Sequence, residues 1–249
     1  MRVALFVPCY VDQFYPRVAI ATLRLLENLG LDVSFPEKQT CCGQPMANGG
    51  YEHYTQGCNT NFIAAFSGYD HIVCPSGSCA LHVKDHLHDP KQEATASAIR
   101  ERVYELCEFL TDVVKVQSLP ASFPAKVALH QGCHGHRGLR LAASSEQVLP
   151  FYSKPLQLLQ MVEGLELVPL SRPDECCGFG GTFCVTEEAV SSAMGLSRVK
   201  DYVDHQATVL TGTDMSCLMH QEGLIRRKQL DITVMHIAEL LAAPLPETV

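Results

Sequence analysis

The sequence predicts an α/β fold of two pseudo-symmetric halves, each built on a parallel sheet and related by an internal duplication. Three observations predict it. Short apolar runs alternate with segments of helical periodicity, the tripeptide Cys-Cys-Gly occurs at 41–43 and again at 176–178, and further cysteines recur at similar spacing around each copy. Equivalent cysteines lie 124, 135 and 138 positions apart, about half of the 249 residues. We expect the two halves to span 1–119 and 125–249.

Strands and helices alternate along the first half. Its apolar, β-branched runs are typical of strands that are buried on both faces of a parallel sheet. Helices are indicated by apolar residues at helical spacing, and Gly30 is a C-cap for the first of them. The predicted strands are 2–7, 31–35 and 71–74, and the predicted helices are 16–29, one ending near 66, one beginning near Ser78 and one over 92–116.

The second half repeats this order after a short linker at Pro120–Pro124, beginning at Lys126. Its predicted strands are 127–130, 165–168, 208–211 and 232–235, and its predicted helices are 146–162, 187–203, 216–228 and a terminal one. This alternation means βαβ units and a parallel sheet. Ligands of open α/β sheets gather at the carboxyl ends of the strands, so cysteines that follow different strands can converge there.

The cysteines of the repeat are candidate ligands of a metal cluster. Adjacent thiols leave a strand on opposite faces and have little use in packing one core. At an iron–sulfur cluster they can reach different irons, and the following glycine lets backbone N–H groups approach the sulfurs. The candidate ligands are Cys9, Cys41, Cys42 and Cys79 in the first half, and Cys133, Cys176, Cys177 and Cys217 in the second. Each set supplies the four thiolates of a cluster, for which we expect [4Fe-4S], one or two per chain.

The other cysteines and two histidines leave alternatives open. Cys58 and Cys107 lie in predicted helices outside the repeat, which favours packing. Cys74 and Cys184 have no counterpart in the other half, and a ligand role for them stays open. Zinc is the alternative metal, because a histidine follows three residues after Cys79 and after Cys217 and zinc accepts sulfur and nitrogen ligands together. If they are not zinc ligands, His82 and His220 are either hydrogen-bond donors to cluster sulfur or exposed helical residues.

The residues after Cys133 form a local basic concentration that consists of His134, His136, Arg137 and Arg140. Beside a cluster they can steer a small carboxylate or stabilise a reduced cluster. A solvated loop is the equally simple interpretation.

Composition bounds the possible partners and the compartment. A formal charge of −8 and the lack of any Lys/Arg-rich block argue against nucleic acid or an anionic membrane as partner. The apolar run from Val3 to Val7 is too short for a signal peptide or a transmembrane segment, so we expect a cytoplasmic protein. In that reducing compartment the 12 cysteines indicate ligands, reactive thiols and packing rather than disulfides.

The motifs around the cysteines resemble the CCG-domain (cysteine-rich domain) iron–sulfur family. They are 41–45 (Cys-Cys-Gly-Gln-Pro), 75–79 (Pro-Ser-Gly-Ser-Cys), 176–183 (Cys-Cys-Gly-Phe-Gly-Gly-Thr-Phe) and 234–239 (Val-Met-His-Ile-Ala-Glu). The family includes one subunit of heterodisulfide reductase and the iron–sulfur subunit of glycolate oxidase, and the likeness is greatest to its lactate-utilisation branch. Relatives of the reductase type have a further cysteine in a Cys-x-x-Cys ending, where this chain has Ser76 and Asp214.

The resemblance implies an electron-transfer subunit that works with two other lactate-utilisation subunits to oxidise L-lactate to pyruvate. The residues show no flavin or nicotinamide site and no paired acid and base, and 178–181 lacks the spacing of a dinucleotide loop. We therefore assign no catalytic residue and expect the isolated chain not to oxidise lactate. The alternative functions are a thiol/disulfide catalyst like heterodisulfide reductase and a zinc-binding scaffold subunit.

Overall fold

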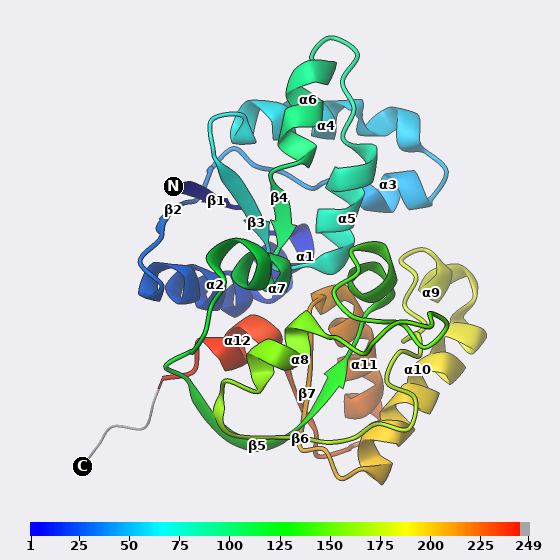
Figure 1. Ribbon diagram of the computed structural model, residues 1–249. Helices are drawn as coiled ribbons and strands as arrows, with labels where there is room; N and C mark the ends of the chain where they lie inside the picture. The colour runs from blue at the N-terminus through cyan, green and yellow to red at the C-terminus, as the bar shows by residue number, and fades with distance from the viewer. Residues whose placement is uncertain (245–249) are drawn as a thin grey trace.

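The chain folds into two halves, each with a four-stranded, all-parallel sheet, in a computed structural model that describes residues 1–244 (Figure 1). The strands of the first sheet are β1 (Arg2–Leu5), β2 (Asp32–Ser34), β3 (His71–Cys74) and β4 (Val103–Glu105), and those of the second are β5 (Ser122–His130), β6 (Glu163–Leu167), β7 (Val209–Gly212) and β8 (Thr233–His236). The strand orders, β2-β1-β3-β4 and β6-β5-β7-β8, are equivalent. The predicted α/β fold with duplicated parallel-sheet halves is therefore confirmed.

Helices cover both sheets. In the first half they are α1 (Cys9–Phe14), α2 (Pro16–Asn28), α3 (Gln44–Asn48), η1 (Glu52–Thr55), α4 (Gln56–Phe66), α5 (Gly77–His86), α6 (Glu93–Arg100), α7 (Leu106–Glu108) and η2 (Phe109–Val114). In the second they are η3 (His134–Gly138), α8 (Lys154–Leu159), α9 (Phe183–Thr186), α10 (Glu188–Asp204), α11 (Met215–Arg227) and α12 (Ile237–Leu241). Within residues 1–244, no helix has the length and apolar character that crossing a bilayer requires.

Local sequence explains the best-predicted elements. α2 starts with Pro16, whose missing N–H is no loss at a helix start, and it buries Val18, Leu25 and Leu26. It ends before Gly30, which has a φ of +78°. α5 starts after Ser76, whose hydroxyl accepts a hydrogen bond from the Cys79 backbone N–H.

The predicted helix over 92–116 is wrong, because a strand interrupts it. α6 ends at Arg100, and β4 then pairs in parallel with β3. A new helix, α7, begins at Leu106 after its N-cap Glu105, whose side chain forms a capping box with Glu108. Apolar residues at helical spacing misled the prediction: Ile99, Val103, Leu106 and Leu110 are all fully buried, yet they belong to different elements.

Two other predictions on the second half need correction. The predicted helix 146–162 is too long. The structure has the shorter helix α8, which begins after the cap Ser153 and has a proline in its first turn. The predicted linker Pro120–Pro124 is partly strand, since β5 starts at Ser122. Pro124 is tolerated because the register shifts between Ser122 and Ala125, and β5 pairs with β7 only from Val127 onward.

The halves pack on each other reciprocally. α12 packs on α2 while α7 packs on α8, and α5 contacts η3 while α1 contacts α11 (Figure 1). Each contact maps onto its counterpart when the halves are exchanged, so the interface has approximate two-fold symmetry. One apolar cluster joins Val3 and Leu26 to Leu129 and Leu240. The ranges 1–119 and 125–249 thus stay a proposed division of the sequence, and positions 245–249 lie outside the described residues.

Candidate metal centres

One cavity of about 500 Å³ lies between the two halves, and all eight cysteines of the repeat line it. It is situated at the carboxyl ends of the strands, because Cys9 follows β1 and Cys133 follows β5, while Cys79 and Cys217 lie in the helices after β3 and β7. The other four cysteines, all within the described residues, are Cys58, Cys74, Cys107 and Cys184, and none of them lines the cavity.

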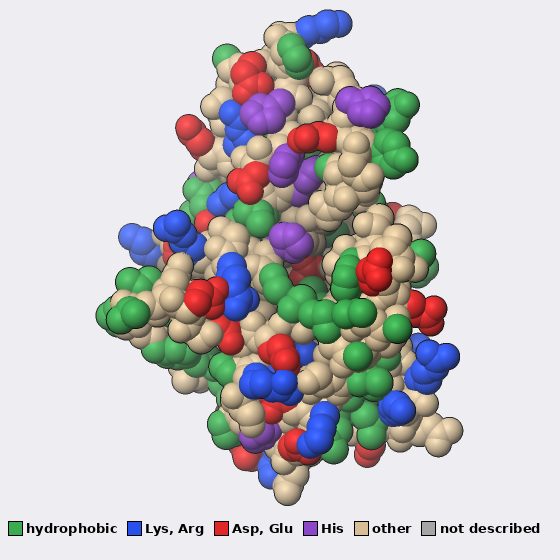
Figure 2. All heavy atoms as spheres, turned by 90° about the vertical axis from the view of Figure 1, so that its right-hand side faces the viewer, with side chains coloured by type: hydrophobic (Ala, Val, Ile, Leu, Met, Phe, Trp, Pro, Cys, Tyr) green, Lys and Arg blue, Asp and Glu red, His purple; other side chains and the backbone are tan. Residues whose placement is uncertain are grey.

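The face that carries α9 and α10 is hollowed between the upper and lower halves, and hydrophobic side chains gather below the hollow (Figure 2). α9 and the loop before it supply lining residues from the second half, including Thr182 and Val185, and α3 supplies Asn48 from the first. The cavity is therefore built by both repeats together.

The first four sulfurs form a chain of close contacts. The Sγ atoms of Cys9 and Cys41 are 3.7 Å apart, and Cys42 contacts both Cys41 and Cys79. The thiols of Cys42 and Cys9 donate to the Cys41 sulfur, which holds the pKa of Cys41 far below the usual range of a thiol. The same interaction raises the pKa of Cys9. The four sulfurs thus lie close together, which is an arrangement suited to binding a metal cation.

The second four sulfurs repeat the arrangement. Cys176 takes the place of Cys41, and the thiols of Cys133 and Cys177 donate to its sulfur, which lowers the pKa of Cys176 strongly. Cys177 also contacts Cys217. The structure therefore brings each predicted set of four cysteines together.

The glycine of each tripeptide turns the backbone toward the sulfurs, as the sequence predicts. Gly43 and Gly178 adopt φ values of +90° and +86°, which favour glycine. The N–H groups of Gly43 and Gly178 each point at the first cysteine of their own tripeptide, at 3.4 Å from its Sγ. A Cβ on Gly178 would lie 2.6 Å from the Ser191 carbonyl oxygen, so this position also excludes every side chain.

Ser76 and Asp214, which replace the extra cysteines, meet between the two halves. Asp214 is the N-cap of α11, where its Oδ1 accepts from the Ser216 N–H at 3.0 Å. Its Oδ2 accepts from the Ser78 N–H at 2.7 Å and from the Ser76 hydroxyl at 3.3 Å. A single buried carboxylate therefore caps the helices that carry Cys79 and Cys217. The repeat in the sequence makes these two positions equivalent, but it does not show that their side chains meet in space.

The two predicted histidines lie behind the tripeptides instead of among the sulfurs. His82 lies beside the Cys42 backbone, and burial lowers its pKa to about 4. His220 lies beside the Cys177 backbone, and burial lowers its pKa as well. Neither is among the described residues that line the cavity. The prediction of an exposed position is wrong for His82, which is 5% exposed.

A histidine that sequence reasoning missed lies at the second site. A ring nitrogen of His130 and the Sγ atoms of Cys177 and Cys217 all lie within 4.8 Å of one another. His130 is fully buried, and burial followed by the charge of Arg198 lowers its pKa to about 3, which keeps the imidazole neutral. The sequence did contain a signal for His130. It lies at the end of the strand before Cys133, at the position that Phe6 occupies in the first half.

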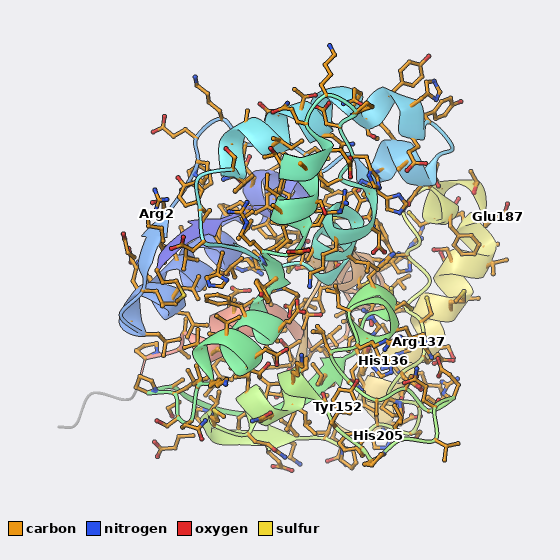
Figure 3. All side chains as sticks on the ribbon, turned by 45° about the horizontal axis from the view of Figure 1, so that its top comes forward. Arg2, His136, Arg137, Tyr152, Glu187 and His205 are labelled. Atoms are coloured by element: carbon orange, nitrogen blue, oxygen red, sulfur yellow. The ribbon has the colours of Figure 1, made fainter. Side chains whose placement is uncertain are left out.

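The basic concentration after Cys133 is divided between buried, paired and cavity-lining residues. His134 lines the cavity, but His136 is buried and Arg137 is paired with Glu146 and Asp174. His136 and Arg137 lie side by side on η3 (Figure 3). The segment is the short helix η3 rather than a loop, but His134, Arg137 and Arg140 are exposed to solvent, and His134 is the member of the four that lines the cavity.

Taken as donors, the residues fit an iron–sulfur cluster in each half. Thiols converge from separate strand ends, neighbouring thiols lower the pKa of one cysteine in each set, and backbone N–H groups point at sulfur. Zinc remains compatible with the sulfur and imidazole donors of the second site.

Comparison with known proteins agrees with the geometry. The CCG cysteine-rich domain matches the chain twice, at 3–84 and 127–221. The chain is 42% identical to lactate utilization protein A of Geobacillus kaustophilus over 98% of its length and 99% of that protein. It is 39% identical to lactate utilization protein A of Bacillus subtilis over 97% of its length and 99% of that protein.

Among solved structures, a hypothetical protein from Helicobacter pylori has a TM-score of 0.61 at 11% identity. All of this chain aligns, but with only 49% of the longer protein, so this likeness concerns the fold. The two domain matches and the near full-length similarity show that this chain belongs to the family of CCG cysteine-rich domain proteins.

Proposed function

We propose that this chain is an iron–sulfur electron-transfer subunit of a multi-subunit system that oxidises L-lactate to pyruvate. The observation that carries the proposal is the convergence of both cysteine sets on one cavity. Relatives with about 40% identity are named for lactate utilisation, which supplies the substrate.

Each set of four cysteines would hold one cluster, for which [4Fe-4S] is the proposed type. Such clusters take up and release single electrons when bound. The chain contributes the thiolates and the N–H groups of Gly43 and Gly178, which stabilise negative charge on sulfur. The N-terminal ends of α5 and α11 carry Cys79 and Cys217, and their helix dipoles act in the same direction.

The cavity is poorly equipped to oxidise lactate by itself. Apart from cysteines, the titratable residues among its described lining are Tyr10, His134 and Asp214, and Asp214 already accepts hydrogen bonds from backbone. Removing a proton and a hydride from a 2-hydroxy acid needs a base and a hydride acceptor. We therefore propose that two other subunits of a cytoplasmic complex supply that chemistry and dock near the strand carboxyl ends, where the cavity opens.

Anaerobic purification followed by iron, sulfide and zinc analysis tests the proposal. We expect about four or eight irons per chain with matching sulfide, and a signal in electron paramagnetic resonance (EPR) after dithionite reduction. Cys41→Ser and Cys176→Ser should each remove the iron of one site, whereas Cys58→Ser, outside the cavity, should remove none. Stoichiometric zinc without sulfide would replace the proposal with the zinc scaffold.

The size of the cavity favours one second candidate, a thiol/disulfide catalyst. An open space between two sets of sulfurs is what a disulfide substrate requires. The pairing of Ser76 with Asp214, in place of two cysteines, argues against it. Turnover of a mixed disulfide by the isolated chain with an artificial electron donor, lost in Cys41→Ser, would establish this function.

A further inference from the structure

The second site differs from the first in three buried positions that are equivalent under the repeat. Strand β1 ends in Val-Ala-Leu before Phe6, and β5 reads Val-Ala-Leu before His130. A Cβ on Gly43 would meet Thr55 and a Cβ on Gly178 would meet Ser191, so Thr55 and Ser191 are equivalent. Counting onward from them along α4 and α10, Phe62 is equivalent to Arg198 and Phe66 to Tyr202.

The first half fills these positions with an aromatic cluster. The ring centroids of Phe6 and Phe62 are 5.0 Å apart, and those of Phe62 and Phe66 are 4.4 Å apart. These three rings offer no lone pair to a metal. The first site therefore has cysteine sulfurs as its donors and an apolar wall behind them.

The second half replaces the cluster with a polar one. The Tyr202 hydroxyl lies 3.4 Å from Nδ1 of His130, and the Arg198 guanidinium lies over the Tyr202 ring at 5.0 Å. All three residues are buried. Buried polar groups are costly unless they have a use or a partner, so this substitution needs an explanation.

The hydrogen bonds around Tyr202 determine the tautomer of His130. The Gln221 side-chain N–H₂ donates to the Cys217 carbonyl at 3.0 Å, which leaves its Oε1 to accept from the Tyr202 hydroxyl at 2.6 Å. The Tyr202 hydrogen is thereby used, so its oxygen accepts from Nδ1–H of His130. The neutral ring then carries its lone pair on Nε2. A hydrogen bond from one ring nitrogen that frees the other is the arrangement found at metal-ligating histidines.

We propose that His130 is a metal ligand of the second site, in addition to the cysteines, and that the two sites of the chain are chemically different. This rests on the proposed function, because the metal is that of the second cluster. The donors are already gathered, since a ring nitrogen of His130 and the sulfurs of Cys177 and Cys217 lie within 4.8 Å of one another. The imidazole is neutral, so it adds a nitrogen donor without changing the number of thiolates, and the two sites then differ in their coordination.

Pulsed EPR on the reduced, anaerobically purified full-length protein tests the proposal. With ¹⁵N-histidine incorporated, a directly coordinated imidazole gives a strongly coupled ¹⁵N signal, and we expect one in the unmodified protein. His130→Phe, which installs the residue of the first half, should lose this signal. His220→Gln changes a histidine beside the same tripeptide but outside the donors, and should retain it.

The outcomes separate the two proposals. If the protein holds iron and sulfide but shows no coupled histidine nitrogen, or keeps the coupling in His130→Phe, the assignment of His130 is wrong while the electron-transfer proposal stands. If it holds no sulfide, the electron-transfer proposal fails first. The labelled unmodified protein decides the question of coordination even if His130→Phe does not fold.

Discussion

Replacing Asp214 with alanine should destabilise the protein more than the loss of any cap from one helix. The carboxylate caps α11 through the Ser216 N–H, which is worth about 1 kcal/mol. It also accepts a charge-assisted hydrogen bond from the Ser78 N–H of the other half, worth about 2 kcal/mol. We therefore expect the free energy of unfolding to fall by about 3 kcal/mol in Asp214→Ala.

Thermal unfolding followed by circular dichroism, under anaerobic conditions, measures this loss. For a chain of this size about 3 kcal/mol corresponds to a decrease in Tm of about 6–12 °C. Ser76→Ala is the matched control, because it removes the cap of α5 at the equivalent position and leaves Asp214 in place. It should lower the Tm by about 3 °C. Equal decreases in the two variants at equal metal content would refute the idea that one carboxylate stabilises both helices.

Other parts of the molecule carry three more predictions. Cys42→Ala or Cys177→Ala should abolish lactate-dependent reduction of an acceptor by the reconstituted complex while partner binding, measured by co-purification, persists; loss of binding as well would make the cysteines structural. Burial raises the pKa of Glu105 to about 8, so the native protein holds a proton that the unfolded chain releases, and stability should fall as the pH rises from about 4.5 to about 8. Glu105→Gln should flatten this part of the stability profile, by at most about 5 kcal/mol between its ends, and an unchanged slope in denaturant titrations would show that another group is responsible. Gly178→Ala should destabilise the protein by about 1–3 kcal/mol more than Gly43→Ala, because a Cβ would overlap the Ser191 carbonyl at Gly178 but only approach Thr55 at 3.1 Å at Gly43; a Tm as high as that of Gly43→Ala would contradict this.

The sequence predicted the elements whose residues decide their own conformation. The strand at 71–74 and the helix after Ser76 have local signals, a buried β-branched run and a cap. β4 has only three residues and continues the apolar spacing of α6, so local periodicity cannot separate it from a helix. The repeat held the missing signal, since the strand predicted at 232–235 is its counterpart in the second half.

The part of the candidate site that could be predicted is formed by an uncommon residue type, cysteine, that recurs in a repeated pattern. The eight cysteines satisfy that condition. His130 and Asp214 do not, because their roles depend on partners brought close by tertiary packing: His130 on Tyr202, and Asp214 on Ser78. Such residues resemble ordinary buried or capping side chains until the tertiary structure places them.

The reciprocal packing of α7 on α8 and of α12 on α2 bears on how such a chain arose. Before the duplication, a single repeat would have had the same apolar faces with nothing of its own to cover them. Two identical copies, related by a true two-fold axis, would bury these faces through self-complementary contacts. The packing of the two halves is the packing that such a symmetric dimer would have. Once the copies were joined, each position was free to change independently of its counterpart, so one ancestral position could become phenylalanine in one half and histidine in the other.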